Sequence, residues 1–378
     1  MKRSPIDDLA AELAALEARS LLRSPRTVPE GAVSLCSNDY LGLAQEPLME
    51  DGTGTHVAGG AGASRLVSGN THEHEALERD LAAWLGVEAC LAFPSGYAAN
   101  VGTLSALVRP GDRVLSDALN HASIIDGIRL ARATVEIVPH LDHEAVARWL
   151  GAGPAGVRTW VVTESYFSMD ADVPALAALS AVCAEAGAAL YVDEAHSLGV
   201  FGPSGRGLCA AAGVVPDVLV GTFGKAFGLG GAFVAGRAIL RKWLWNRARS
   251  FVFSTGLSPL LAAEARRRLP RIAAADRERT HLLALADRLR RGLVALGCDV
   301  RGVGPVVPWV LSDAAQAVAL ADALKARGYF VQAIRPPTVP EGTSRIRLSV
   351  TAAHHESDIT GFLRAVAELK ETWGASSS

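Results

Sequence analysis

The chain has 378 residues, of which 49% are hydrophobic and 20% charged, and its formal net charge at pH 7 is −2. These values are typical of a globular protein with a large core, and they argue against a general nucleic-acid binder, which would carry a clustered basic surface. No apolar run approaches the roughly 20 residues of a membrane helix, and Asp7, Asp8 and Glu12 occupy the region where a signal peptide needs its apolar stretch. The five cysteines are scattered without a CxxC pair, so we expect reduced thiols, no metal site and a cytoplasmic enzyme.

The first 25 residues predict an amphipathic helix, which with the segment up to residue 40 forms an N-terminal arm. Short apolar runs follow between about residues 86 and 236, and most are continuous, which indicates strands covered on both faces. Ala- and Leu-rich stretches of crossover length separate them. We therefore predict a large α/β domain over 41–257 with a mostly parallel sheet of about seven strands. The expected strands are 89–93, 112–116, 134–138, 159–163, 188–192, 218–222 and 231–235.

The pattern changes after about residue 257, where a long arginine-rich helical stretch leads into a shorter set of strands. We predict a smaller C-terminal α/β domain over 258–378. Its expected elements are a helical stretch at 258–297, strands at 306–311, 329–334 and 345–350, a helix at 313–327 and a last helix at about 355–373.

Polar side chains follow two strands of the predicted sheet. Asp193 and His196 come at the end of one strand, and Thr222 and Lys225 come at the end of the next. Lysine is rare in this chain, with five occurrences against 32 arginines, so Lys225 between apolar segments suggests a nucleophilic amine. A lysine and a carboxylate at one sheet edge match the needs of pyridoxal phosphate, which bonds to an amine and pairs its ring nitrogen with an acid. Solvation of a strand end is the competing interpretation of Asp193 alone.

The glycine-rich stretch around Lys225 is not a nucleotide loop. A Walker A motif would need glycine and Ser or Thr where Leu219 and Ala226 stand. The dinucleotide motif fails as well, because Phe233 occupies the place of its third glycine.

Two further segments lie at predicted strand ends. Ser95, Gly96 and Tyr97 lead from a strand into a helix, whose N-terminal amides suit a phosphate group, although a turn of this kind is also common as plain helix capping. His121 follows another strand end, where its flat ring could stack on a pyridine. His72 and His74, by contrast, point apart on a predicted helix and do not make a metal site.

Seven motifs in order closely resemble the α-oxoamine synthases, which are pyridoxal-phosphate enzymes of the aspartate-aminotransferase fold. The resemblance covers residues 30 to 360, nearly the whole chain. The motifs are "SNDYLGL" (37–43), "SRLVSGNTHEHEALE" (64–78), "SGYAAN" (95–100), "NHASIIDG" (120–127), "TESYFSMDAD" (163–172), "DEAHSLGVFGPSGRG" (193–207) and "TFGKAFGLGGA" (222–232).

The resemblance implies that Lys225 bonds covalently to the cofactor, that Asp193 pairs with its ring nitrogen, and that His196 binds its ring oxygen. It implies that His121 stacks on the ring. It also implies that Gly96, Tyr97, Ser168 and Thr222 surround the ring and phosphate, that Asn38 and Glu164 lie near the substrate, and that Arg347 receives an amino acid's carboxylate.

The motif "FSTGLSP" (253–259), with Ser254 and Thr255, resembles a segment that reaches the cofactor phosphate of a neighbouring subunit, which implies a homodimer with shared active sites. The stretch "AIRPPTVP" in 331–354 resembles the family member that joins L-alanine to a pimeloyl thioester of coenzyme A or acyl carrier protein in biotin biosynthesis. Thr338, and Arg23 by a looser alignment, match substrate-contacting positions. Two alternatives stay open, namely another pair of amino acid and acyl thioester, or a non-catalytic relative that only binds the cofactor.

Overall fold

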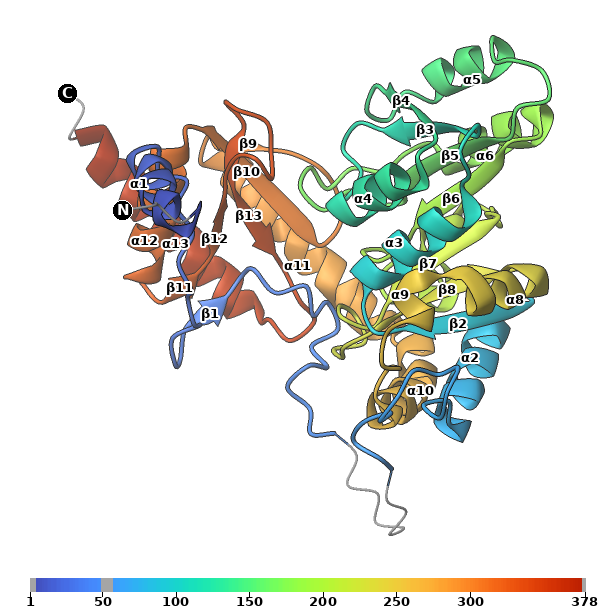
Figure 1. The fold of residues 1–378 in the computed structure, drawn as a ribbon. Coiled ribbons are helices and arrows are strands. Elements are labelled where there is room, and N and C mark those ends of the chain that lie inside the picture. The colour runs from blue at the N-terminus through green and yellow to red at the C-terminus, as the bar shows by residue number, and fades with distance from the viewer. Residues whose placement is uncertain (1–4, 49–56, 376–378) are drawn as a thin grey trace. The chain divides into compact units, whose positions relative to one another are not determined.

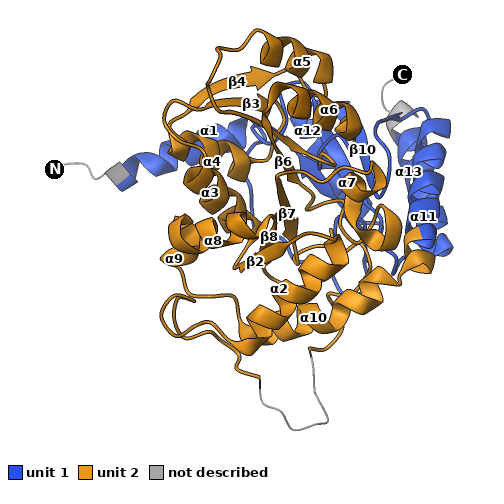
Figure 2. Ribbon diagram, turned by 90° about the vertical axis from the view of Figure 1, so that its right-hand side faces the viewer, with its two compact units in different colours: residues 1–37, 168–171, 280–378 blue, residues 38–167, 172–279 orange. Residues whose placement is uncertain are grey.

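The computed structural model describes residues 5–48 and 57–375 (Figure 1). These residues form two compact units (Figure 2). Unit 2 takes Asn38–Phe167 and Asp172–Arg279, and unit 1 takes the chain up to Ser37, the short segment Ser168–Ala171 and the chain from Thr280 onward. Helix α11 (Asp276–Ala295) begins in unit 2 and continues into unit 1.

The sheet of unit 2 confirms the predicted α/β architecture. Its strand order is β2-β8-β7-β6-β5-β3-β4, and every neighbouring pair is parallel except the two that β8 makes. Each predicted strand is found within one residue of its expected bounds. The strands are β2 (Ala89–Phe93), β3 (Arg113–Asp117), β4 (Thr134–Val138), β5 (Thr159–Glu164), β6 (Ala189–Asp193), β7 (Val218–Thr222) and β8 (Ala232–Gly236).

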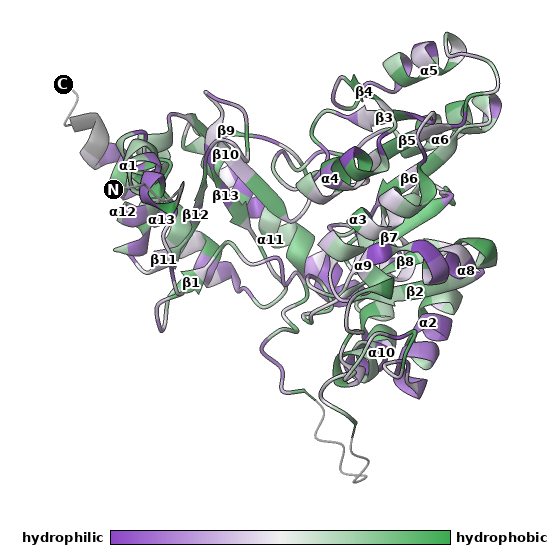
Figure 3. Cartoon of the chain, viewed as in Figure 1, coloured by the Kyte–Doolittle hydropathy of each residue, from purple (hydrophilic) through white to green (hydrophobic). Residues whose placement is uncertain are grey.

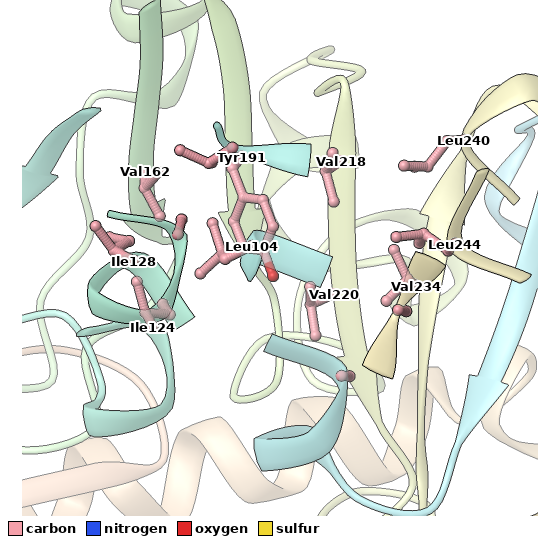
Figure 4. Close-up of a cluster of buried hydrophobic side chains, with 14 of the residues drawn as sticks. Leu104, Ile124, Ile128, Val162, Tyr191, Val218, Val220, Val234, Leu240 and Leu244 are labelled. Carbon is pink, nitrogen blue, oxygen red and sulfur yellow. The ribbon is translucent and has the colours of Figure 1, made fainter. Parts of the chain in front are cut away.

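Both faces of this sheet are buried, which explains the continuous apolar runs. Along β5, for example, Trp160 and Val162 contribute to one hydrophobic core, whereas Val161 between them contributes to the other. Figure 4 shows the first of these cores, where Leu104 and two isoleucines of the neighbouring helix face Tyr191 and Val162. Figure 3 shows hydrophobic residues along much of the sheet.

The helices of unit 2 connect and cover these strands. They are α2 (His72–Leu85), α3 (Gly96–Leu107), α4 (Ala122–Ala131), α5 (His143–Gly151), α6 (Leu176–Ala186), α7 (Gly207–Ala211), α8 (Ala238–Arg247), α9 (Arg249–Val252) and α10 (Pro259–Ala273), with a 3-10 turn at Pro203–Gly205. Helices α3 and α4 both begin just beyond strand ends, and each has a side-chain cap at its start, from Ser95 and His121 respectively.

Unit 1 is the smaller α/β unit. Helix α12 (Ala314–Lys325) packs on its antiparallel sheet, whose order is β12-β13-β10-β9. The strand predicted at 329–334 is divided at Val331, because its first part pairs with β1 and its second part with β13. The strands are β1 (Val33–Ser34), β9 (Asp299–Val300), β10 (Val306–Ser312), β11 (Tyr329–Phe330), β12 (Gln332–Ile334) and β13 (Ser344–Ser349).

Two further helices of unit 1 lie near the ends of the sequence. The N-terminal helix α1 (Leu9–Ala18) follows a 3-10 turn at Pro5–Asp8 and buries none of its side chains, and the last helix is α13 (Glu356–Ala375). Unit 2 extends through α10, beyond the boundary expected at residue 257, so the division into 1–40, 41–257 and 258–378 stays a prediction. Among the described residues, no helix has the length and apolar composition needed to cross a membrane. All five cysteines are free.

Candidate active site

Asp193 ends β6, and its carboxylate lies at the carboxyl edge of the sheet. Its carboxylate is buried and accepts hydrogen bonds from the Asn100 side chain at 2.7 Å and from the Ala195 amide at 2.8 Å. The two donors occupy different carboxylate oxygens and therefore fix the plane of the group. An acid held in this way keeps its direction when a partner binds, which supports pairing with a protonated ring nitrogen.

Asn100 and Tyr191 form the support beneath Asp193, and neither was identified from the sequence. The Tyr191 hydroxyl donates to the side-chain oxygen of Asn100 at 2.7 Å, and the side-chain nitrogen of Asn100 also donates to the Ser123 hydroxyl at 2.9 Å. Asn100 and Tyr191 are almost fully buried. The motif "SGYAAN" contains Asn100, so the sequence carried the signal, but its role appears only when α3 is placed beside β6.

His121 and Glu164 lie at the ends of β3 and β5 and contact one another. The His121 amide donates to the Glu164 carboxylate at 2.7 Å, and the Ser123 amide donates to His121 Nδ1 at 3.2 Å. Since Nδ1 accepts, the proton of the neutral ring lies on Nε2. Desolvation lowers the pKa of His121, and the Lys225 charge acts in the same direction against the opposing effect of Asp193.

Glu164 is a buried carboxyl group in the same field of charges. Burial, together with the negative charge of Asp193, raises its pKa to about 8, although Lys225 and the His121 amide act against this rise. Lys225, His121, Glu164 and Asp193 therefore influence one another's charge, as expected for groups that share one site.

Lys225 lies in the turn between β7 and β8. The Thr222 hydroxyl donates to the Gly231 carbonyl at 3.0 Å and accepts from the Gly224 amide at 3.0 Å, so it ties the two ends of this turn together. Gly228 has a φ of 65°, and a Cβ atom there would lie 2.5 Å from the Ala44 amide nitrogen. Close packing against the "SNDYLGL" segment thus explains a glycine that first suggested a phosphate loop.

The start of α3 lies beside Thr222. A Cβ atom on Gly96 would be 3.9 Å from the Thr222 hydroxyl oxygen, and Ser95 caps the helix by accepting from the Ala98 amide at 3.1 Å. The other N-terminal amides of a helix have no acceptor within it and suit an anion. Tyr97 is half exposed, and its hydroxyl donates to Asp126 of α4.

His196 is held by a residue that the sequence did not single out. The Tyr40 hydroxyl lies 2.7 Å from His196 Nδ1 and 3.4 Å from the Asn38 side-chain oxygen. This arrangement brings the predicted residues Asn38 and His196 to one hydroxyl group. Tyr166 also contacts His196, with ring centroids 6.3 Å apart.

The segment after α9 carries Ser254 and Thr255. Thr255 is exposed, and the ring of Phe253 before it is 73% exposed. The next residue is anchored within the unit, because the Gly256 amide donates to the Ala63 carbonyl at 3.0 Å.

Unit 1 contains the remaining predicted residues. Arg347 is buried on β13, and its guanidinium donates to the Ser168 carbonyl at 2.6 Å and to the Ser349 hydroxyl at 2.9 Å. Arg23 donates to the Thr338 hydroxyl at 2.8 Å. The structure therefore brings together two pairs of residues that the sequence predicts for substrate or cofactor binding.

His74 has a structural role. It completes a capping box with Thr71 at the start of α2, and its other ring nitrogen lies 2.7 Å from the Leu257 carbonyl oxygen. Among the residues that the structure describes, no group of three or more His, Cys, Asp or Glu side chains could hold a metal ion.

The residues of unit 2 fit pyridoxal phosphate chemically. A buried carboxylate with two fixed donors suits the ring nitrogen, and a lysine in the same field of charges suits the aldehyde. The helix start beside Thr222 offers amides for the phosphate.

Comparisons with known proteins agree with this fit. Residues 30–366 match the family Aminotransferase class I and II. The chain belongs to this family. It is 48% identical to 8-amino-7-oxononanoate synthase of Anaeromyxobacter dehalogenans (strain 2CP-1 / ATCC BAA-258) over 98% of this chain and 97% of that protein.

Two solved structures show the same fold. Serine palmitoyltransferase of Sphingomonas wittichii is 32% identical over 98% of both chains, with a TM-score of 0.89. A high-resolution structure of SPT with a PLP internal aldimine is 30% identical over 98% of this chain and all of that one, with a TM-score of 0.88. These matches confirm the predicted aspartate-aminotransferase-like fold.

Proposed function

We propose that the protein catalyses the reaction of 8-amino-7-oxononanoate synthase, the decarboxylative condensation of L-alanine with a pimeloyl thioester in biotin biosynthesis. The observation that carries this proposal is the 48% identity to a synthase of that name over nearly both whole chains, compared with 32% to a serine palmitoyltransferase of the same fold. The stretch "AIRPPTVP" supports the same choice. A non-catalytic relative is disfavoured because Lys225, Asp193, His196 and His121 are all present.

The cofactor is pyridoxal phosphate, which supplies an electron sink for bonds broken at the amino acid's α-carbon. Lys225 would hold it covalently. Asp193 keeps a proton on the ring nitrogen, and the hydrogen bonds from Asn100 and Ala195 keep this carboxylate in place. His196, oriented by Tyr40, binds the ring oxygen.

The start of α3, where Gly96 and Tyr97 offer amides beside Thr222, would hold the phosphate. Ser168 also contributes to cofactor binding. This assignment rests on its motif.

Two groups of the chain move protons in this account. Lys225 Nζ would accept the proton from the alanine α-carbon. The Ser123 amide, which donates to Nδ1, favours a proton on Nε2 of His121, and that atom would donate to the thioester carbonyl oxygen as negative charge develops there. The same imidazole would stack on the cofactor ring.

Substrate binding involves five further residues. Arg347 binds the carboxylate of alanine, Asn38 and Glu164 lie near the amino acid, and the pair Arg23 and Thr338 contacts the acyl substrate. Arg347 is the strongest of these assignments on chemical grounds, since a guanidinium binds a carboxylate through two parallel hydrogen bonds.

The active form is a homodimer. Ser254 and Thr255 reach the cofactor phosphate of the neighbouring subunit, and the exposure of Phe253 and Thr255 supports contact outside the protomer. The acyl carrier is coenzyme A or acyl carrier protein.

A coupled assay of thiol release tests the function. Purified protein loaded with pyridoxal phosphate is given alanine, glycine or serine in combination with pimeloyl, acetyl, succinyl or palmitoyl thioesters. We expect the highest kcat/KM for alanine with the pimeloyl thioester. A clear preference for serine with a palmitoyl thioester, or for glycine with a short acyl group, would replace this function by that of another member of the family.

A further inference from the structure

His140 lies in the turn after β4, outside the residues described above, and its two ring nitrogens contact two different carboxylates. Nδ1 is 2.8 Å from Asp117 and Nε2 is 3.0 Å from Asp172. A carboxylate only accepts hydrogen bonds, and a neutral imidazole has a single N–H, so both bonds form only when the ring is protonated. Burial disfavours that charge, but the two carboxylates outweigh it and raise the pKa of His140 to about 10.

Asp117 connects His140 to the segment that carries His121. One oxygen of this carboxylate also accepts from the Leu119 amide at 2.9 Å, and the other accepts from the Leu141 amide at 3.0 Å. Asp117 therefore shapes the three-residue turn between β3 and His121 as well as the turn that contains His140. Through the Leu119 amide, the Asp117 carboxylate contacts the segment that leads directly into His121.

Asp172 connects His140 to the segment that leaves β5. The backbone carbonyl of Asp172 accepts from the Phe167 amide at 3.0 Å, and the Phe167 ring meets the His140 ring edge to face, with centroids 4.5 Å apart. The second oxygen of Asp172 is buried and accepts no hydrogen bond within the described chain. Within the described chain, His140 is therefore the hydrogen-bond partner of the Asp172 carboxylate.

The charges that act most strongly on His140 are both negative. Asp117 and Asp172 are the charged groups that act on the ring. Asp142, nearby on the same turn, caps α5 through the Ala145 amide at 2.7 Å and lies 3.8 Å from Arg148. Without His140, the two carboxylates from different segments would lose the charged partner that they share, which disfavours their present positions.

We propose that His140 is a positioning residue, an imidazolium that ties the β3–α4 turn to the segment leaving β5 and thereby holds His121 at its working angle. This inference rests on the proposed function only for the role of His121. Histidine suits the task because its two N–H groups point in different directions from a rigid ring, whereas lysine would donate from a single atom.

Nuclear magnetic resonance of the cofactor-free protein, labelled with ¹⁵N at histidine, tests the charge without any assay of activity. The ring signals of His140 are assigned by their loss in His140→Gln. We expect protons on both ring nitrogens from pH 6 to 9 and, in Asp172→Asn, a titration at least about one pH unit lower because one negative charge is gone. A neutral His140 ring at pH 8 in the wild type, or an unchanged titration in Asp172→Asn, overturns the proposal.

Kinetics and spectroscopy of His140→Gln test the positioning, with His143→Gln as the matched control. A displaced catalytic group commonly costs about tenfold or more in rate, so we expect kcat to fall at least tenfold while the alanine KM changes less than twofold. The visible circular dichroism of bound pyridoxal phosphate should change as His121 shifts. A kcat within twofold of the wild type, or an unchanged dichroism spectrum, overturns the proposal.

Two further results keep the test decisive. If His140→Gln does not fold, the double variant with Asp172→Asn, which removes one cation and one anion together, should fold and still show the reduced kcat, and a wild-type kcat in that variant overturns the proposal. If the wild type does not condense alanine with a pimeloyl thioester, the proposed function is wrong, whereas the resonance measurement still decides the state of His140.

Discussion

The replacement of Asn100 by alanine tests the network that orients Asp193. The change removes a charge-assisted hydrogen bond to Asp193, worth about 1.5–3 kcal/mol, and leaves the buried Tyr191 hydroxyl without its acceptor, which costs about 1–3 kcal/mol. We therefore expect Asn100→Ala to lower the free energy of unfolding by about 3–5 kcal/mol. Tyr191→Phe removes only the neutral bond and should cost about 0.5–1.5 kcal/mol.

Urea unfolding of the cofactor-free variants, followed by tryptophan fluorescence, measures these differences. The double variant should lose less stability than the sum of the single variants, by about 1–2 kcal/mol, because no unpaired hydroxyl remains in it. Loosening of Asp193 should also weaken pyridoxal phosphate binding about tenfold, measured by equilibrium dialysis, which corresponds to about 1.4 kcal/mol. A loss below about 1 kcal/mol in Asn100→Ala, or strict additivity in the double variant, would refute the reasoning.

Three other changes test individual groups of the site. Lys225→Ala should abolish turnover and the visible absorbance of the lysine-bound cofactor, whereas Lys242→Ala on the surface of α8 should keep both; an undiminished band would remove Lys225 from its role. Arg347→Lys should raise the alanine KM at least about tenfold, because a lysine cannot make the paired contact, and an unchanged alanine KM would argue against carboxylate binding. For Glu164→Gln, the direction in which stability changes with pH follows from the pKa of Glu164, which burial and Asp193 raise from 4.5 to about 8. Because the folded protein binds this proton more tightly than the unfolded chain, the free energy of unfolding of the wild type should fall relative to that of the variant as the pH rises from about 5 to 8.5. Urea unfolding measures both values, and a difference between them that does not change with pH would contradict the burial argument.

The sequence predicted those helices and strands whose residue pattern can be recognised within a single segment of the chain. The seven strands of unit 2 are continuous apolar runs because both faces of the sheet are covered, and this property can be seen in each run separately. Polar residues at strand ends were equally visible. Since carboxyl ends of parallel strands share one edge, the order of residues along the chain was enough to assign Asp193 and Lys225 to a common site.

Residues that act through geometry were not predicted. Asn100 supports Asp193 from a different element, and Tyr40 reaches His196 across more than 150 residues of sequence. His140 is one histidine among ten, and only the placement of Asp117 and Asp172 on both sides of its ring distinguishes it. The split of the 329–334 strand at Val331 has the same origin, since pairing partners far along the chain decide it.

The most direct test of the proposed function follows the atoms of one turnover. Protein loaded with pyridoxal phosphate is incubated with pimeloyl-coenzyme A and alanine labelled with ¹³C at its carboxyl carbon, and thiol, carbon dioxide and product are measured together by mass spectrometry. We predict equal amounts of free thiol, labelled carbon dioxide and unlabelled 8-amino-7-oxononanoate. Label retained in the product, or thiol released without carbon dioxide, would contradict a decarboxylative condensation at this site.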